Sequence, residues 1–273
     1  MSGYDTVLSK PSLPITSGTR FVAFFETSIL FGNYIMNNLL AQMKERHSSR
    51  ALFNPDRMIG KDDLHKILEA GSWAPTAHNM QNFEVIIIDD KKVIEAIGNI
   101  RMPVSLTFVK ENYRQFSFSE EELKKKKTGV LAATFPPSSR NPEITEEDLA
   151  ASERDSFMRQ ELFSTPVLGI VLYDPSRRAP ASEGNFLGVI SLGCVMENMW
   201  LMANSLGIDL HIVSSLSNSP SEKSIKKLLG VPEELIIAYS FRLGYALAPY
   251  KYIRVRRDVE DFTHHNKYGN KGV

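Results

Sequence analysis

The pattern of apolar and polar positions predicts alternating strands and helices over most of the chain after residue 60. Short, strongly apolar runs bounded by polar or turn-forming residues are typical of strands in a mostly buried sheet. Such runs lie at residues 83–88, 166–173, 210–213 and 236–243. Apolar residues at helical spacing predict helices at residues 61–70, 91–97, 188–206 and 221–229. Strands that alternate with helices favour an α/β or α+β fold and leave the strand order open.

Some of these helices have features that predict their surroundings. The helix at 188–206, GVISLGCVMENMWLMANSL, is apolar nearly all round, so we expect it in the middle of the fold. Gly71 suits the end of the helix at 61–70. An earlier helix, which Ser28 would cap and which runs to about Glu45, has an apolar face that would pack on the core or on a partner chain.

The chain is expected to contain a single domain with flexible additions. Residues 1–28 are rich in Ser, Pro, Gly and Thr and predict an N-terminal arm, followed by one domain at 29–262 and a polar tail at 263–273. Residues 104–160 are charged and rich in proline and serine, which predicts an insertion with helical pieces. Its four lysines at 124–127 are flanked by acidic residues and favour a solvated face, while a lid over an active site is the functional alternative.

Composition argues against several functional classes. The 273 residues carry 32 Lys and Arg against 32 Asp and Glu, and this zero net charge argues against general nucleic-acid binding. The single cysteine, Cys194, excludes a disulfide scaffold and a multi-cysteine zinc site, and within an apolar helix it is expected to be a buried structural thiol. The six histidines are scattered, so no metal site is predicted. We expect no targeting or membrane-spanning segment, and a cytoplasmic location.

Two basic clusters have the clearest capacity for chemistry, since the common dinucleotide, P-loop, zinc-protease and hydrolase motifs are absent. The first follows the early helix and comprises Arg46, His47, Ser48, Ser49 and Arg50. Its guanidinium groups and hydroxyls suit a phosphate, because arginine donates in a rigid fork and serine adds a short donor. A solvated helix end is the alternative, and spacing alone favours it. The second cluster comprises Arg254, Arg256 and Arg257, and a single phosphate could be held by both.

The loop before the strand at 83–88 is also polar. From residue 74 its sequence is APTAHNMQ, with a proline and short polar groups ahead of a buried strand. Asn79 and Gln81 each present an amide donor and an acceptor, which suits hydrogen bonding to a flat heterocycle. A plain connecting loop is the alternative when this segment is considered alone.

Taken together, three segments resemble the FMN-dependent nitroreductase family. RHSSRALF at 46–53 resembles the family's Arg-x-Ser-x-Arg/Lys opening, and WAPTAHNMQNFEVIII at 73–88 resembles its Ala-Pro-Ser-x-x-Asn-x-Gln-Pro-Trp-x-Phe loop and strand. The third segment comprises Glu197-Asn198-Met199, SLGIDLHIVSS at 205–215 and LLGVPEELIIAYSFRLGYA at 228–246. The chain departs from the family at Asn82-Phe83, where Pro-Trp is frequent, and at Ala77, where serine is frequent. The order and separation of the motifs make the combination specific.

The resemblance implies an α+β sandwich in which a mixed, mainly antiparallel sheet is flanked by helices, built as an intertwined homodimer with FMN at the interface. By this resemblance, the FMN phosphate and ribityl chain are held by Arg46, His47, Ser48 and Arg50, with Arg254 and Arg256 closing on the phosphate. The isoalloxazine is contacted from the other subunit by Pro75, Thr76, Ala77 and Asn79. The backbone amides around Ser214 and Ser215 face the N5 edge of the flavin. The register among Arg254, Arg256 and Arg257 stays open.

The resemblance also implies the reaction. NADH or NADPH would reduce FMN, leave, and be replaced by a small flat acceptor such as a nitroaromatic or a quinone, which gives ping-pong kinetics. No side chain is predicted to act as a catalytic acid or base. Two alternatives stay open: a narrower flavin enzyme of the same family, such as a reductive dehalogenase, and a non-catalytic flavin-binding dimer.

Overall fold

The computed structural model describes residues 38–271, with gaps at 101, 103–104, 112–116, 135–140, 142, 152–153, 218 and 249–251. The predicted arm at 1–28 and the capping residue Ser28 lie outside the described residues. Residues 38–45 are helical, as predicted, and belong to a unit separate from the one formed by the rest of the chain.

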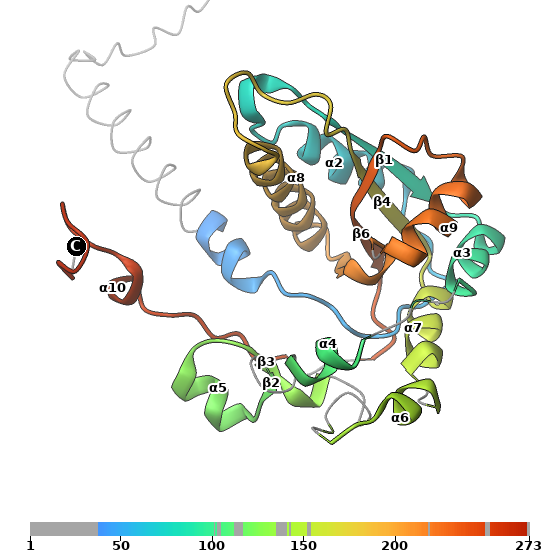
Figure 1. Ribbon diagram of the computed structural model, residues 1–273, viewed down its shortest axis with the longest axis horizontal. Coiled ribbons are helices and arrows are strands. Elements are labelled where there is room, and N and C mark those ends of the chain that lie inside the picture. Colours follow the sequence, from blue (N-terminus) through green and yellow to red (C-terminus); the bar gives the residue numbers. More distant parts are fainter. Residues whose placement is uncertain are drawn as a thin grey trace, which may run out of the picture. The chain divides into compact units, whose positions relative to one another are not determined.

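A four-stranded sheet forms the centre of the larger unit (Figure 1). Its strands, in spatial order, are β1 (Phe83–Ile88), β4 (Val167–Tyr173), β6 (Ile236–Gly244) and β5 (Asp209–Val213). All three ladders are antiparallel, with Ile86 opposite Ile170 and Ile170 opposite Ser240. The sequence therefore predicted all four strands within one residue at each end. The only described parallel pairing is a two-residue ladder between β2 (Ser117–Phe118) and β3 (Val130–Leu131), outside the main sheet.

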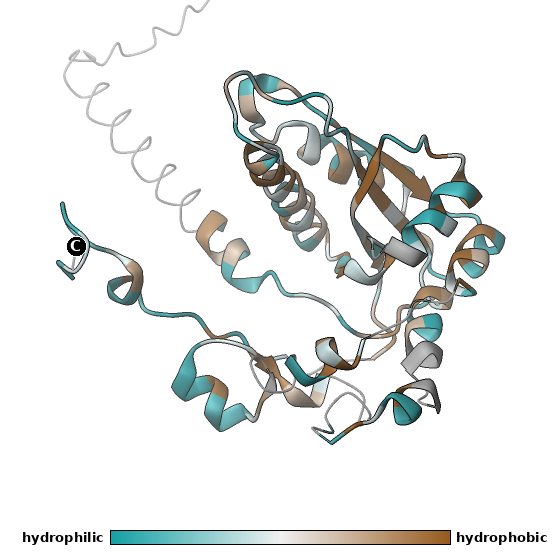
Figure 2. Cartoon of the chain, in the orientation of Figure 1, coloured by the Kyte–Doolittle hydropathy of each residue, from teal (hydrophilic) through white to brown (hydrophobic). Residues whose placement is uncertain are grey.

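Helices pack on both faces of the sheet (Figure 1). One face carries α2 (Lys61–Ser72) and α8 (Phe186–Ser205). The other carries α3 (Lys91–Gly98), α7 (Arg154–Phe163) and α9 (Ser219–Leu229). A hydrophobic core lies on each face of the sheet: the first core under α2 and α8, and the second core under α3, α7 and α9. Successive residues of a strand point to opposite faces, so Val167 lies in the first core and Leu168 in the second. Burial on both faces explains why β4 is a continuous apolar run, whereas the edge strands β1 and β5 are only partly buried. The hydropathy colouring shows the apolar character of the sheet (Figure 2).

The prediction that α8 lies in the middle of the fold is wrong within this chain. The side of the helix that carries Val195 and Met199 is buried, but its first turns expose Phe186, Val189 and Ile190, with Phe186 71% exposed. An apolar pattern on all sides does not reveal which of those sides the same chain covers. Among the described residues, α8 is also the one helix long and apolar enough to cross a membrane, a test that the core helix of a globular protein passes equally well.

Gly71 lies within α2 and does not end it, contrary to the prediction. The helix continues to Ser72, and a Cβ at position 71 would lie 2.9 Å from Cγ of Met199 on α8. Glycine at this position therefore allows the two helices to approach closely. In the sequence alone, a glycine required for close packing cannot be distinguished from one that ends a helix.

The predicted insertion contains short helices, as expected. They are α4 (Leu106–Glu111), α5 (Glu120–Lys126) and α6 (Glu146–Ala151), and α7 overlaps its end. Helix α5 has a capping box at Ser119, three glutamates in its first turn and three lysines in its last, in keeping with the helix dipole. These three lysines are solvent-exposed, as predicted, while Lys127 pairs with Asp258, just before α10 (Val259–Phe262).

Candidate functional site

The segment that follows the first helix is fixed against the edge of the sheet. The Ser49 amide donates to the Leu210 carbonyl of edge strand β5 at 3.1 Å. The Trp200 indole of α8 donates to the His47 carbonyl at 3.1 Å, and the Leu247 amide donates to the Leu52 carbonyl at 2.9 Å. Residues 46–53 thus run along the protein in an extended form rather than as a free helix end.

The side chains of this segment lie in defined surroundings. Arg46 forms an ion pair with Glu197 at 3.0 Å and lies 4.5 Å above the Trp200 ring, so α8 orients its guanidinium. The His47 ring stacks on Tyr252 with centroids 3.8 Å apart and an interplanar angle of 9°. Ser48 and Arg50 are half-buried.

The stack between His47 and Tyr252 joins the two basic clusters, which are about two hundred residues apart in the sequence. The Arg254 guanidinium lies 5.3 Å from the centroid of the same Tyr252 ring, so Tyr252 contacts a residue of each cluster. Arg256 donates to the carbonyl of its own neighbour Val255, and Arg257 donates to the Asp261 carbonyl. The structure therefore brings Arg254 to the first cluster and directs Arg257 toward its own C-terminal segment.

The loop between α2 and β1 is held in an unusual conformation. It contains a single 3₁₀ turn (Ala77–Asn79), and His78, Asn79 and Gln81 have φ angles of 51°, 52° and 45°. Non-glycine residues seldom adopt this left-handed region, and such strain persists only where the surroundings impose it. Thr76 imposes it locally, since its carbonyl accepts from the Asn79 amide and its hydroxyl from the Gln81 amide.

This loop is attached to the first turns of α8. The Ala77 amide donates to the Ser191 hydroxyl at 3.1 Å. Arg46 contacts the same helix at Glu197, so α8 positions both of the segments that the sequence singled out.

The third predicted contact region is a 3₁₀ turn (Ser214–Ser217) directly after β5. Ser214 is exposed, and its carbonyl accepts from the Ser217 hydroxyl at 2.7 Å. The Ser215 hydroxyl is buried and has no hydrogen-bond partner among the described residues. A buried hydroxyl in this state is a donor available to a ligand.

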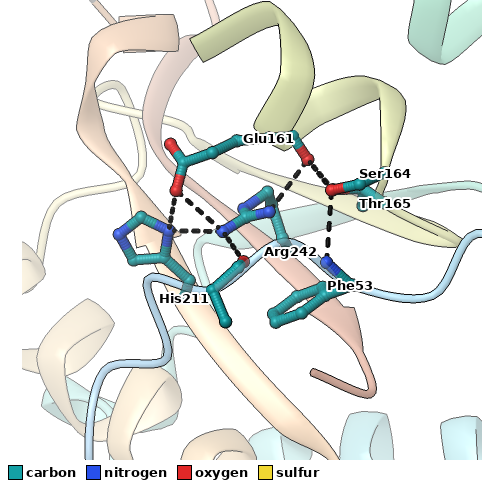
Figure 3. A network of polar contacts seen from close by, with 7 residues as sticks. Phe53, Glu161, Ser164, Thr165, His211 and Arg242 are labelled. Atoms are coloured by element: carbon teal, nitrogen blue, oxygen red, sulfur yellow. Dashed lines mark hydrogen bonds and ion pairs between the residues drawn. The ribbon is translucent and has the colours of Figure 1, made fainter. Parts of the chain in front are cut away.

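A buried charged network lies behind the first cluster (Figure 3). Arg242 of β6 is fully buried and donates to the Glu161 carbonyl at 2.8 Å, to Glu161 Oε1 at 3.0 Å and to the Ala51 carbonyl at 3.2 Å. Its Nη2 also lies 3.0 Å from Nδ1 of His211. This network was not predicted from the sequence, although an arginine within the mostly apolar strand IIAYSFRLG was the available signal.

Burial controls the titration of this network. It raises the pKa of Glu161 above its ordinary value, although the charges of Arg242 and Arg50 act in the opposite direction. Burial lowers the pKa of His211 well below its ordinary value, and Arg242 and Arg50 lower it further. His211 is therefore neutral at pH 7, and Arg242 is the guanidinium in direct contact with the Glu161 carboxylate.

Comparison with known proteins identifies the family. A model of the nitroreductase family matches residues 43–245, which include the whole sheet and the helices on both faces. The chain belongs to the nitroreductase family.

Individual relatives are distant in sequence. An NADPH-dependent oxidoreductase of Staphylococcus aureus (strain USA300) is 22% identical over 227 residues, which cover 83% of this chain and 72% of that protein. Among solved structures, an FMN-dependent nitroreductase from Clostridium difficile R20291 has a TM-score of 0.53 at 16% identity, over 84% of this chain and 99% of the other. A nitroreductase with bound FMN from Desulfitobacterium hafniense DCB-2 has a TM-score of 0.51 at 19% identity, over 84% and 98%. These structures share the fold.

In this nitroreductase-family chain, the predicted site residues therefore fall into three places. The first is the segment at 46–50 together with Arg254, the second is the loop at 75–79, and the third is the turn at 214–217. Helix α8 contacts the first two, and β5 leads from the first to the third. Among the described residues, no group of three His, Cys, Asp or Glu side chains could hold a metal ion.

Proposed function

We propose that this chain is an FMN-dependent oxidoreductase that uses NADH or NADPH to reduce a small flat acceptor, such as a nitroaromatic or a quinone. Membership of the nitroreductase family and the NADPH-dependent oxidoreductase of Staphylococcus aureus support the electron donor. The FMN-bound nitroreductase of Desulfitobacterium hafniense supports the cofactor. The observation that carries the proposal is the stack of His47 on Tyr252, because it gathers basic groups from both ends of the domain.

The residues present fit the phosphate of FMN. Arg50 is half-buried and makes no hydrogen bond or ion pair with any residue that the structure describes, so its guanidinium is available to a phosphate. Ser48, two residues before Arg50, adds a hydroxyl, and Arg254 adds a second cation from the C-terminal segment. We assign the phosphate and ribityl chain to Arg46, His47, Ser48, Arg50, Arg254 and Arg256. Bound FMN would supply the two-electron chemistry, and these groups would hold and orient it.

We assign the isoalloxazine ring of FMN to the loop at 75–79 and to the turn at 214–217. Pro75, Thr76, Ala77 and Asn79 form a constrained wall, and rigid walls restrict how a ring can lie. The backbone amides around Ser214 and Ser215, with the unpartnered Ser215 hydroxyl, would offer donors to its polar edge. We assign no side chain a proton-transfer role.

We further propose that the wall and the phosphate site come from opposite subunits of a homodimer. The exposed apolar side chains of Phe186, Val189 and Ile190 support this, because an apolar surface of this kind on a soluble protein marks an interaction site. The exposed turns of α8 adjoin Ser191, which holds the wall. A partner covering these turns would therefore lie close to the flavin.

The test is the absorption spectrum of the purified protein, followed by anaerobic reduction with each nicotinamide. We expect flavin bands, or their appearance on addition of FMN, and rapid bleaching by NADH or NADPH. Arg50→Gln should weaken FMN by about 1.5–3 kcal/mol, as for loss of a hydrogen bond to a charged group. Arg57→Gln, in an exposed residue that stacks on Tyr245, is the matched control and should bind FMN as the wild type does.

The same samples separate the remaining functions. A protein that gives no spectral change on FMN titration would contradict the proposal altogether. Bound flavin that neither nicotinamide reduces would indicate a non-catalytic flavin dimer. A panel of acceptors then distinguishes reduction of nitroaromatics and quinones from reductive dehalogenation.

A further inference from the structure

The turn assigned to the polar edge of the flavin begins where the edge strand β5 ends. Val213 is the last residue of β5 and pairs with Ser240 of β6, and the turn starts at Ser214. Ser240 is fully buried, and its hydroxyl donates to the Val213 carbonyl at 2.5 Å. A serine of the neighbouring strand therefore holds the carbonyl of the peptide bond that leads into the turn.

The direction of this carbonyl fixes the direction of the Ser214 amide. The peptide bond is planar and trans, so the N–H of Ser214 points away from the Val213 carbonyl. The carbonyl is held by β6, and β5 lies at the end of the sheet, so the amide points outward from the sheet edge. The side to which backbone groups point alternates along a strand, and the Leu210 carbonyl likewise points outward, to the Ser49 amide at 3.1 Å. The Ser214 amide thus faces the edge along which the segment at 46–53 runs.

The turn contains a second donor beside this amide. The Ser215 hydroxyl is buried and has no hydrogen-bond partner among the residues that the structure describes. The Ser214 carbonyl cannot easily serve it, because this carbonyl already accepts from the Ser217 hydroxyl at 2.7 Å. Donors of this kind suit a ligand with acceptors along one edge, and the isoalloxazine ring has such acceptors at N5 and at the adjacent carbonyl oxygen.

We propose that Ser240 is a positioning residue of the cofactor site: by holding the Val213 carbonyl, it directs the Ser214 amide toward N5 of the flavin. This inference rests on the function proposed above. Ser240 itself is buried on the opposite side of the peptide bond and does not touch the cofactor. Without its hydroxyl, the peptide bond between Val213 and Ser214 is held less firmly, and the amide is presented to N5 for less of the time.

The decisive measurement is the ratio of FMN affinity to 5-deaza-FMN affinity, obtained by exchanging one flavin for the other in the holoprotein. In 5-deaza-FMN a C–H group replaces N5, so this position cannot accept a hydrogen bond. The phosphate, the ribityl chain and the outline of the ring are the same in both molecules. Loss of folding, of phosphate contacts or of ring packing therefore lowers both affinities and leaves their ratio unchanged. The wild type should prefer FMN by about three- to tenfold, as for one hydrogen bond.

Three variants test the role of the Ser240 hydroxyl. Ser240→Ala removes it and should bring the ratio most of the way to one, whereas Ser240→Thr keeps a hydroxyl and should keep the wild-type ratio. Thr165→Val is the matched control, because the Thr165 hydroxyl is also buried and donates to a carbonyl, that of Glu161, at 2.7 Å. It lies outside the turn, so its removal should leave the ratio unchanged.

Each outcome decides the matter. A Ser240→Ala protein that keeps the wild-type ratio overturns the inference, and so does one that binds both flavins more weakly by the same factor, which shows a purely structural role. An equal fall of the ratio in Thr165→Val contradicts it as well. If Ser240→Thr does not fold, the comparison of Ser240→Ala with Thr165→Val is sufficient. A wild-type protein that binds the two flavins equally overturns this inference and leaves the proposed cofactor intact. A wild-type protein that binds neither overturns the proposed function and this inference together.

Discussion

His211 lies on β5 with its side chain 12% exposed, facing Glu161 and Arg242 in the network and the charge of Arg50 beyond it. Protonation would place a cation directly beside the Arg242 guanidinium in a buried site, and the charge of Arg50 also opposes it. The folded chain therefore resists protonating this ring, whereas the unfolded chain accepts the proton at an ordinary pKa.

This difference predicts acid sensitivity. Below about pH 6.5 the unfolded state binds one more proton at position 211 than the folded state, so the free energy of unfolding falls as pH falls, by up to about 1.4 kcal/mol per pH unit. Denaturant unfolding between pH 5.5 and 8 should show this slope in the wild type and a smaller one in His211→Gln. The raised pKa of Glu161 contributes a slope of opposite sign, so the comparison of variants isolates His211.

His65→Gln, an exposed change on α2, is the control for removing a histidine and should keep the wild-type slope. Equal slopes in wild type and His211→Gln would show that the folded chain protonates this ring as readily as the unfolded chain does.

How much of the site could be predicted depended on distance along the chain. Arg46 to Arg50 are contiguous, so their type and spacing were enough to suggest a phosphate. Arg242 and Glu161 lie 81 residues apart on elements that no local pattern pairs. Tyr252, which joins the two basic clusters, was missed for the same reason.

At the level of elements, the four strands were predictable because each is a short, mostly apolar run, which the sheet buries fully in β4 and partly in the edge strands β1 and β5. The role of glycines was not, because it depends on the neighbouring element. Gly169 on β4 faces the Phe241 ring on β6, and a Cβ there would lie 2.5 Å from Cε1.

Gly169→Ala should therefore destabilise the protein by about 1–3 kcal/mol, the usual cost of overpacking a core. Thermal or denaturant unfolding measures this loss directly. Gly169→Ala combined with Phe241→Leu removes the ring that the new methyl group meets and should be less destabilised than the sum of the two single changes. Strictly additive losses would show that the core absorbs the methyl group elsewhere.

At the scale of the whole molecule, the exposed turns of α8 predict the oligomeric state. Val189→Glu places a charge at a residue 60% exposed in the single chain and buried in the proposed dimer. It should weaken dimerisation by at least about 2 kcal/mol and reduce flavin occupancy in proportion. Light scattering and the flavin-to-protein absorbance ratio report the two effects.

Leu228→Glu, at an exposed position of α9, introduces the same charge away from α8 and should leave both quantities unchanged. A wild-type monomer with full FMN occupancy would be incompatible with a site shared between subunits.

The insertion at 104–160 gives a separate test of substrate choice. Its last helix, α7, should be retained, because Leu162 lies in the second core and Glu161 contacts Arg242. Replacing residues 112–151 by a short Gly-Ser linker should leave FMN affinity nearly intact. Preference among flat acceptors should change by up to about tenfold for each lost aromatic contact. Proportional loss of activity toward every acceptor, with loss of folding, would show that the segment is structural.

The two attachments on α8 also limit how the length of this chain can vary. Ser191 holds the loop at 75–79 and Glu197 holds Arg46, six residues and about 9 Å further along the helix. One residue inserted between them would turn one attachment by about 100° relative to the other. Relatives that keep both attachments should therefore have a fixed number of residues in this part of α8.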